Sequence, residues 1–272
     1  MIYTYNDSCQ ISSTAVINES IIGFGNSCGV IKLLDVNLFT IIANWVSSSG
    51  YSINGLKMLT SNQLASIDFN NGYVKVWNLN SIANPTIYKS LFENSNLFSL
   101  EIIDNDTVAI GAGLNRVSVW KVSNATRLKM LSIGLIVNSL MYFKPFGLLL
   151  CSGTNYFKFW NTTSWSLSSS YNYLSFSNSV FTKINDYTIY FIASNSLYSF
   201  SLRYNKTTRL TSTGSYIALD KLDNGLIATS NSLFSLVFFN TTNGSIVKTV
   251  TSAHTSTINP ILNIPSNIFI II

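Results

Sequence analysis

The feature of this sequence that most constrains its fold is a hairpin that recurs along the whole chain. In each copy, two apolar strands flank a turn of Asn, Asp, Gly, Pro or Ser. The copies read AVINESIIGFG, LKMLTSNQLASI, EIIDNDTVAIGAG, YFKPFGLLLCSG, KINDYTIYFIAS, DKLDNGLIATS and LNIPSNIFIII. Their second strands begin 37 to 44 residues apart, near Ile21, Leu64, Val108, Leu148, Ile189, Leu226 and Ile268. A period near 40 residues predicts a repeat fold.

A third strand follows most of these hairpins and carries a bulky apolar landmark. The landmarks are Trp77, Trp120, Trp160, Phe200 and Phe239, with Leu34 in the first copy. A more polar fourth strand follows, as in NPTIYKSLF, ATRLKMLSI and GSIVKTVTS. Four short strands without helical periodicity predict an antiparallel all-β protein without helices, and four strands per unit form the blade of a β-propeller. One blade cannot cover both of its faces, so neighbouring blades must stack.

We predict one propeller domain over residues 1–272, with seven four-stranded blades of which the last is incomplete. Six copies have a third strand, whereas the seventh supplies only Ile258–Ile264 and Asn267–Ile272. The N-terminal strand IYTY, Ile2–Tyr5, is the candidate to pair with this last copy. A truncated fragment, or six blades with an extra hairpin, are the alternatives.

The units resemble the WD-repeat family. VKVWN, VSVWK and FKFWN match the tryptophan strand of that family, but Asn78, Lys121 and Asn161 replace the aspartate that follows the tryptophan. Phe239–Ile258 is the fullest match, with Ala253 and His254 at the family's Gly-His position. His254 is the only histidine, so the family's Asp-His-Ser/Thr-Trp network cannot be complete in another blade. The resemblance implies a rigid scaffold that binds a protein or peptide through the loops of one face.

Candidate catalytic groups are few. A single histidine leaves little room for a Ser-His or Cys-His pair. Asp104 with Asp106, and Asp220 with Asp223, lie in expected turns, where aspartate accepts backbone hydrogen bonds. The glycine-rich stretches GFGNSCG and GAGLNR lead into strands, so no helix N-terminus is available for a phosphate.

We therefore predict a noncatalytic protein-interaction scaffold with no catalytic, cofactor-binding or metal-binding residues. The alternative is a propeller enzyme or a carbohydrate-binding lectin, with carboxylates and aromatic residues gathered at a central channel. The tyrosine-rich run Ser170–Phe176 is either part of a partner surface or packed in the core.

Charge and hydropathy restrict the partners and the location. The net charge is +5, but the sixteen basic residues are scattered, which argues against nucleic-acid binding. The longest apolar region is interrupted by Asn138, Lys144 and Pro145, so no membrane span is expected. The N-terminus has no pattern of a secretory signal. We expect a monomer or part of a larger chain, and a cytoplasmic location is favoured over an extracellular fragment.

The cysteines and the glycosylation sequons leave this location open. Cys151 lies in an apolar run and is expected to be a free structural cysteine, whereas a bridge between Cys9 and Cys28 would need an oxidising compartment. Asparagine is abundant enough to produce Asn-X-Ser/Thr sequons by chance, and glycosylation is the other interpretation. The sequons begin at Asn6, Asn18, Asn105, Asn124, Asn161, Asn205, Asn240 and Asn243.

Overall fold

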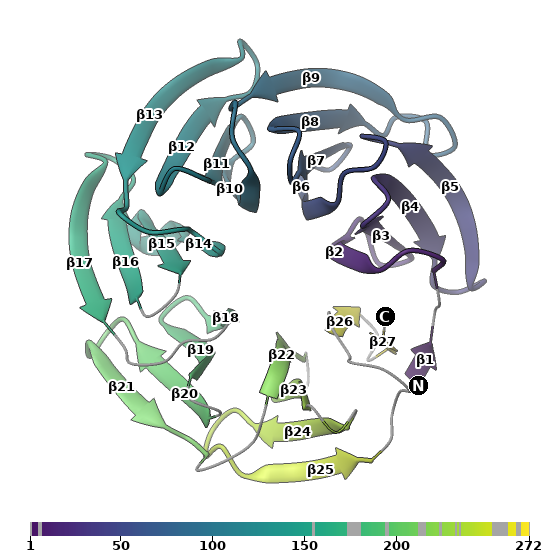
Figure 1. Ribbon diagram of the computed structural model, residues 1–272. Coiled ribbons are helices and arrows are strands. Elements are labelled where there is room, and N and C mark those ends of the chain that lie inside the picture. Colours follow the sequence, from purple (N-terminus) through teal and green to yellow (C-terminus); the bar gives the residue numbers. More distant parts are fainter. Residues whose placement is uncertain are drawn as a thin grey trace. The chain divides into compact units, whose positions relative to one another are not determined.

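A computed structural model of the 272-residue chain has an all-β β-propeller fold with six four-stranded antiparallel blades (Figure 1). Within the described residues the helical structure is one 3-10 turn, η1 (Lys144–Phe146). The structure describes residues 2–4, 7–153, 156–172, 181–193, 196–211, 216–222, 225–231, 233, 235–251, 261–264 and 268–271.

The chain divides into two compact units. The N-terminal unit comprises Asp7–Ser152 and Lys158–Ser170, and the C-terminal unit comprises Met1–Asn6, Gly153–Phe157 and Tyr171–Ile272. Blade 1 contains β2 (Ile11–Val16), β3 (Ile21–Asn26), β4 (Val30–Asp35) and β5 (Thr40–Val46). Blade 2 contains β6 (Ile53–Thr60), β7 (Gln63–Asp68), β8 (Tyr73–Asn78) and β9 (Thr86–Phe92). Blade 3 contains β10 (Leu97–Asp104), β11 (Thr107–Ala112), β12 (Arg116–Lys121) and β13 (Thr126–Ser132).

The remaining blades follow the same order of strands. Blade 4 contains β14 (Ser139–Phe143), β15 (Leu148–Gly153), β16 (Tyr156–Asn161) and β17 (Ser166–Asn172). Blade 5 contains β18 (Phe181–Asn185), β19 (Thr188–Ala193), β20 (Ser196–Ser201) and β21 (Lys206–Arg209). Blade 6 contains β22 (Tyr216–Lys221), β23 (Leu226–Asn231), β24 (Leu236–Asn240) and β25 (Ile246–Val250).

The prediction of seven blades is wrong, because the last copy forms a three-stranded sheet and not a four-stranded blade. Its strand order is β1-β27-β26, with β1 at Ile2–Thr4, β27 at Ile268–Ile271 and β26 at Ile261–Ile264. The expected pairing of the N-terminal strand with the last hairpin is confirmed: β1 pairs in parallel with β27. The seventh copy has no third-strand sequence, so this single added strand leaves the sheet one strand short.

The sequence repeat locates the strands closely. Four of the seven predicted second strands begin where expected, and the other three begin one residue earlier. The second strands are the most buried: five consecutive residues of β11 are buried. The fourth strand β13 has a single buried residue. This gradient explains why the second strands are apolar throughout, whereas the fourth strands carry charges and hydroxyl groups.

Small residues allow successive blades to approach closely. Within the N-terminal unit the first strands β2, β6, β10 and β14 contact one another in that order. A Cβ atom on Gly111 would lie 2.8 Å from the carbonyl oxygen of Val137. Val137 lies in the connection between β13 and β14, which leads from blade 3 to blade 4. The Ser99 hydroxyl donates a hydrogen bond to that same carbonyl (3.1 Å). The small side chains at Gly111 and Ser99 therefore allow blade 3 to approach the connection that leads to blade 4.

Cations on the third strands of blades 1–4 form what we call latches, and all of these latches lie in the N-terminal unit. Each latch is a bond from a third-strand Lys or Arg to a group in or beside the connection that precedes its blade. Three of these connections begin with Ser47, Glu93 or Ile133, the first residues after fourth strands. The latches join Lys32 to Asp7 (2.9 Å), Lys75 to Asp68 (3.1 Å) and to the Ser47 carbonyl, Arg116 to Glu93 (3.0 Å), and Lys158 to the Ile133 carbonyl (2.7 Å).

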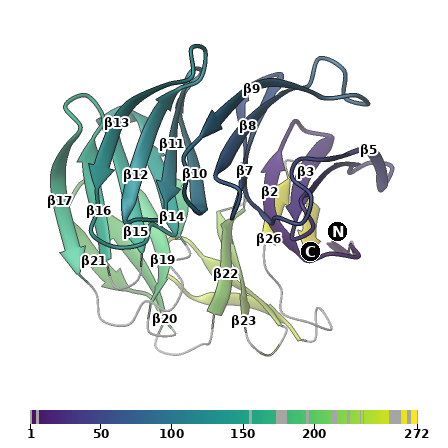
Figure 2. The ribbon, with the colours of Figure 1, turned by 45° about the horizontal axis from the view of Figure 1, so that its top comes forward.

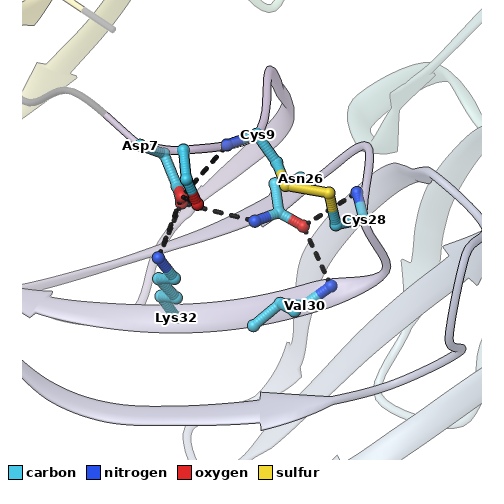
Figure 3. Close-up of polar contacts among 7 residues, drawn as sticks. Asp7, Cys9, Asn26, Cys28, Val30 and Lys32 are labelled. Carbon is cyan, nitrogen blue, oxygen red and sulfur yellow. Dashed lines mark hydrogen bonds and ion pairs between the residues drawn. A yellow bond between two sulfur atoms is a disulfide. The ribbon is translucent and has the colours of Figure 1, made fainter.

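The first latch lies beside a disulfide that ties the segment before β2 to blade 1 (Figure 3). Cys9 and Cys28 are joined with their Cα atoms 6.0 Å apart. The Asp7 carboxylate accepts hydrogen bonds from Lys32 Nζ (2.9 Å), Asn26 Nδ2 (3.3 Å) and the Cys9 amide (3.4 Å). Burial alone would raise the pKa of Asp7, but these hydrogen bonds outweigh it and lower the pKa below its usual value.

In the C-terminal unit, aromatic side chains from several strands pack together. The Phe157 ring contacts Tyr171, Phe181, Phe191 and Phe200, with ring centroids 5.0 to 6.1 Å apart. Phe157 is fully buried. Three of its four ring pairs are edge-on, a geometry that aromatic quadrupoles favour.

Candidate binding site

The candidate site is a pocket of about 520 Å³ at one end of blade 3, whose strands can be followed from β10 to β13 in Figure 2. Three segments form it: the connection between β9 and β10, the turn between β11 and β12, and the connection between β13 and β14. We call this end of a blade the pocket end. The lining residues are Asn94, Ser95, Asn96, Phe98, Gly113, Leu114, Asn115 and Ile136.

Backbone hydrogen bonds fix the walls of the pocket. The Gly113 amide donates to the Asn96 carbonyl (2.7 Å), which joins the first wall to the turn. The amides of Ile133 and Gly134 both donate to the Asn115 carbonyl (2.9 and 3.2 Å). The three segments are therefore tied together before any ligand arrives, as a preformed site requires.

The turn between β11 and β12 has an unusual backbone. Leu114 and Asn115 have φ values of 62° and 59°, in the left-handed region. At the equivalent turns of blades 1 and 2, the residue just before the third strand is a glycine at positive φ, Gly29 or Gly72. A left-handed conformation costs a residue with a Cβ about 1–2 kcal/mol. A leucine held there marks this turn as a functional candidate, since strained residues cluster at binding sites.

The strained turn also displays apolar side chains to solvent. Leu114 is 74 % exposed, and Leu135 and Ile136 on the facing connection are 50 % and 46 % exposed. Asn94, Asn96 and Asn115 line the same pocket as Leu114 and Ile136. None of the eight lining residues is ionisable. The pocket therefore offers neutral hydrogen-bond donors and acceptors beside apolar contact area.

A buried carboxylate supports both walls. Glu93 precedes Asn94 and its side chain is fully buried. Arg116 Nη2, which follows the strained turn, donates to the Glu93 carbonyl (2.9 Å) and to its carboxylate (3.0 Å). Trp120 Nε1 donates to the other carboxylate oxygen. Arg127 lies 3.7 Å from the carboxylate and over the Trp120 ring. This cluster fixes the positions where the two walls begin.

The described acidic residues that were candidates for catalysis accept hydrogen bonds from nearby groups of their own blades. Asp104 accepts a hydrogen bond from the Asp106 amide (2.8 Å), and Asp106 accepts bonds from the amide and hydroxyl of Ser123 (both 2.7 Å). The turn interpretation of this pair is confirmed. Asp220 accepts a bond from the Lys221 amide (2.8 Å). Asp223 lies outside the described residues.

Other residues singled out by the sequence bear less on the site. The two glycine-rich stretches join β3 to β4 and β11 to β12, so both lead into strands as expected. Cys151 is free and buried, and burial raises the pKa of its thiol far above the usual value, which makes it unreactive. Ala253 and His254 lie outside the described residues, as do residues 173–176 of the tyrosine-rich run.

In the described part of the chain, no group of three or more His, Cys, Asp or Glu side chains gathers in a way that could hold a metal ion. No helix in that part has the length and hydropathy of a membrane span. The buried carboxylates of Asp68 and Glu93 are each paired with their own cation.

No protein-family model matches the chain, and no curated protein matches its sequence. Two tryptophans at equivalent positions of neighbouring blades have different hydrogen-bond partners. Trp77 Nε1 donates to the Ser66 hydroxyl (3.0 Å), which corresponds to the Ser/Thr-Trp part of the WD-repeat network. Trp120, at the equivalent position of the next blade, bonds to Glu93 instead.

Sequence reasoning missed this pocket. The available signal was the apolar Leu114 between a glycine and an asparagine in a turn, where polar residues are usual. Leu135 and Ile136 were considered only as part of an apolar run that was tested for a membrane span. Neither signal shows that the two loops meet, because that depends on contact between strands far apart in the sequence.

Proposed function

We propose that this chain is a noncatalytic scaffold, a divergent relative of WD-repeat propellers, and that the blade 3 pocket binds an extended segment of a protein partner. The single observation that carries the proposal is Leu114, an exposed leucine in a strained conformation at the mouth of an amide-lined pocket. An extended peptide presents backbone N–H and C=O groups. An asparagine amide can bind both, because its oxygen accepts hydrogen bonds and its NH2 group donates them. Its apolar side chains would pack against Leu114 and Ile136.

The character of the lining supports binding over catalysis. Acid-base or nucleophilic chemistry needs an ionisable or nucleophilic side chain beside the substrate. The lining offers neutral amides, one serine hydroxyl and apolar groups, and no base among these eight residues can activate that serine. A volume of about 520 Å³ suits one or two side chains with their backbone, and lies in the usual range of ligand pockets.

The proposal is tested by selection from a library of random displayed peptides. We expect selected peptides to contain an apolar anchor, and Leu114→Gly or Ile136→Ser to weaken binding at least about tenfold, since central apolar contacts dominate such interfaces. Leu38→Ser is the matched control, because Leu38 is equally exposed but lies in the turn between β4 and β5. Binding that survives both pocket variants would overturn the proposal.

The glycine variant separates binding from folding. Glycine adopts the left-handed region without penalty, so Leu114→Gly is expected to keep or raise the free energy of unfolding. A loss of binding in this variant would then reflect the missing side chain and not a damaged fold. Urea denaturation of the same preparation checks this.

A neutral carbohydrate is the second candidate ligand. The three asparagine amides and the Phe98 ring favour it, since amides bind sugar hydroxyls and aromatic faces contact sugar C–H groups. A glycan array screened with the same variants distinguishes the two ligands. Glycan binding that depends on Asn94 and Phe98 but not on Leu114 would replace the peptide proposal with a lectin.

A further inference from the structure

The glycosylation sequons are distributed unevenly between the two ends of the blades. The pocket end carries the turn between second and third strands and the connections between blades, and we call the other the far end. In blade 3 the far end comprises residues 105–106 and 122–125. Each described sequon asparagine lies at the far end of its own sheet: Asn18, Asn105, Asn124, Asn161, Asn205, Asn240 and Asn243. Asn6 lies outside the described residues.

Asparagine itself is common at both ends, so composition does not explain this asymmetry. A random origin of the sequons predicts them in pocket-end segments as well. None of the described pocket-end asparagines has Ser or Thr two residues later. These are Asn26, Asn70, Asn71, Asn94, Asn96, Asn115, Asn138, Asn172 and Asn231.

Turn chemistry does not require the sequons either. In the third-to-fourth turn of blade 4, Asn161 accepts hydrogen bonds from the amides of Thr163 and Ser164 (both 2.9 Å). In blade 1, Asp35 accepts the equivalent bonds from Asn37 and Leu38 (2.8 and 3.0 Å). An aspartate without a following hydroxyl therefore makes the same turn. The pairing of Asn with Ser or Thr at the far ends needs another explanation.

Three of the sequons have a geometry suited to modification. Asn18, Asn124 and Asn243 are exposed. In each, Oδ1 accepts a hydrogen bond from the backbone amide of the Ser or Thr two residues later, at 2.9 to 3.2 Å. The atom that glycosylation modifies is the side-chain nitrogen, Nδ2, so these bonds do not involve the reacting atom.

The disulfide provides an independent observation. Disulfides form and persist in oxidising compartments and are rare in the cytosol. Two thiols lose two electrons and two protons when they form one, and a disulfide oxidant of such a compartment accepts them. The Cys9–Cys28 bridge therefore points to folding in an oxidising compartment, contrary to the cytoplasmic location that the sequence favours.

We propose that the chain matures in an oxidising compartment and carries N-linked glycans at Asn18, Asn124 and Asn243. In the modification, Nδ2 attacks the anomeric carbon of an oligosaccharide linked to a lipid pyrophosphate. The new N–C bond forms, the bond from that carbon to the pyrophosphate oxygen breaks, and Nδ2 loses one proton. In blade 3 the glycans would not cover the pocket end, because Asn105 and Asn124 lie at the far end of the same sheet.

Site mapping on the protein from its source cells tests the proposal. The protein is captured with an antibody and treated in ¹⁸O-water with an amidase that converts glycosylated asparagine to aspartate. Mass spectrometry is expected to find labelled aspartate at positions 18, 124 and 243, and a Cys9–Cys28 cross-linked peptide before reduction. Unmodified asparagine at all three positions would overturn the proposal, whatever the result of the peptide selection.

Expression in secreting eukaryotic cells adds a control on position. Asn18→Gln, Asn124→Gln and Asn243→Gln are each expected to remove one glycan from the electrophoretic pattern without lowering the melting temperature. The engineered Asn96→Thr change creates a sequon at Asn94 on the pocket rim. We expect a glycan there to abolish ligand binding in the pocket, whereas the native glycans leave binding unchanged. Unaltered migration of all three Gln variants would contradict the assignment.

Discussion

The first four blades and the fifth stabilise the same repeat in different ways. Two residues before the landmark of the third strand, blades 1, 2 and 4 carry Lys32, Lys75 and Lys158, and each lysine forms a latch. Blades 5 and 6 carry Tyr198 and Val237 at this position. Tyr198 stacks on Phe191, with ring centroids 5.4 Å apart. One position in the repeat can thus serve directional polar bonding or aromatic packing.

The comparison teaches where ligand-binding loops can be held rigidly. A latch bonds to the backbone or side chain of a connection between blades, so it fixes the loop as well as the sheet. The pocket lies beside such a latch, where Arg116 holds Glu93. Aromatic packing acts on the strands instead, since the Phe157 ring contacts rings on β17, β18, β19 and β20. The proposed binding site lies in the latched region.

The largest effect is expected from the aromatic region. Phe157→Ala removes a fully buried ring that contacts four other rings, and should lower the free energy of unfolding by about 4 kcal/mol. Leu167→Ala, at an exposed position of the neighbouring strand β17, is the control and should cost much less. Urea denaturation measures both. A cost below about 1 kcal/mol for Phe157→Ala would mean that aromatic packing does not stabilise this region.

The next effect tests the latches. Glu93→Ala leaves Arg116 without its carboxylate partner, and breaking a buried ion pair costs about 3 kcal/mol or more. Because the pocket walls begin at this pair, we also expect weaker ligand binding. Glu19→Ala, at an exposed turn, is the control. Equal stability of the two variants would show that the latch contributes nothing.

The disulfide is expected to contribute slightly less to the free energy of unfolding than the Glu93–Arg116 latch. Cys28→Ser opens a loop with a sequence separation of 19 residues, and the chain-entropy estimate for such a loop is about 3 kcal/mol. Adding a reductant should reproduce the loss in the native protein and in Cys151→Ser, which keeps the bridge, whereas Cys28→Ser should not respond to the reductant. A native protein that is indifferent to reductant would show that this bridge does not stabilise blade 1.

The sequence predicts the strands well because each blade repeats the same pattern of burial. The hairpin turns and the landmarks such as Trp77 and Phe239 locate the strands within a residue or two. The number of blades is harder, because it depends on how many strands the ends contribute, and Ile2–Thr4 adds only one. In the sequence the lysines of the third strands are single polar residues between apolar neighbours, as in VKVW, and no local pattern identifies their partners.

The candidate site is less predictable because it depends on tertiary contacts. Leu114 reads as one apolar residue in a turn, and its left-handed backbone is a property of the folded loop. The partner of Arg116 is 23 residues away and belongs to the preceding connection. The Cys9–Cys28 bridge depends in addition on the redox state of the compartment, which the sequence does not establish. Local patterns identify elements, whereas sites arise where distant elements meet.

The smallest effect is expected from protonation of Asp7 in the first latch. The folded-state pKa of Asp7 is below its usual value, so its contribution is fully present above the unfolded pKa of about 3.9. It is lost as the pH falls below that value and through the folded pKa. Asp7→Asn should therefore lower stability at pH 7 and flatten the dependence of stability on pH below about 4. Denaturation curves of both proteins at several pH values measure this, and equal slopes would contradict it.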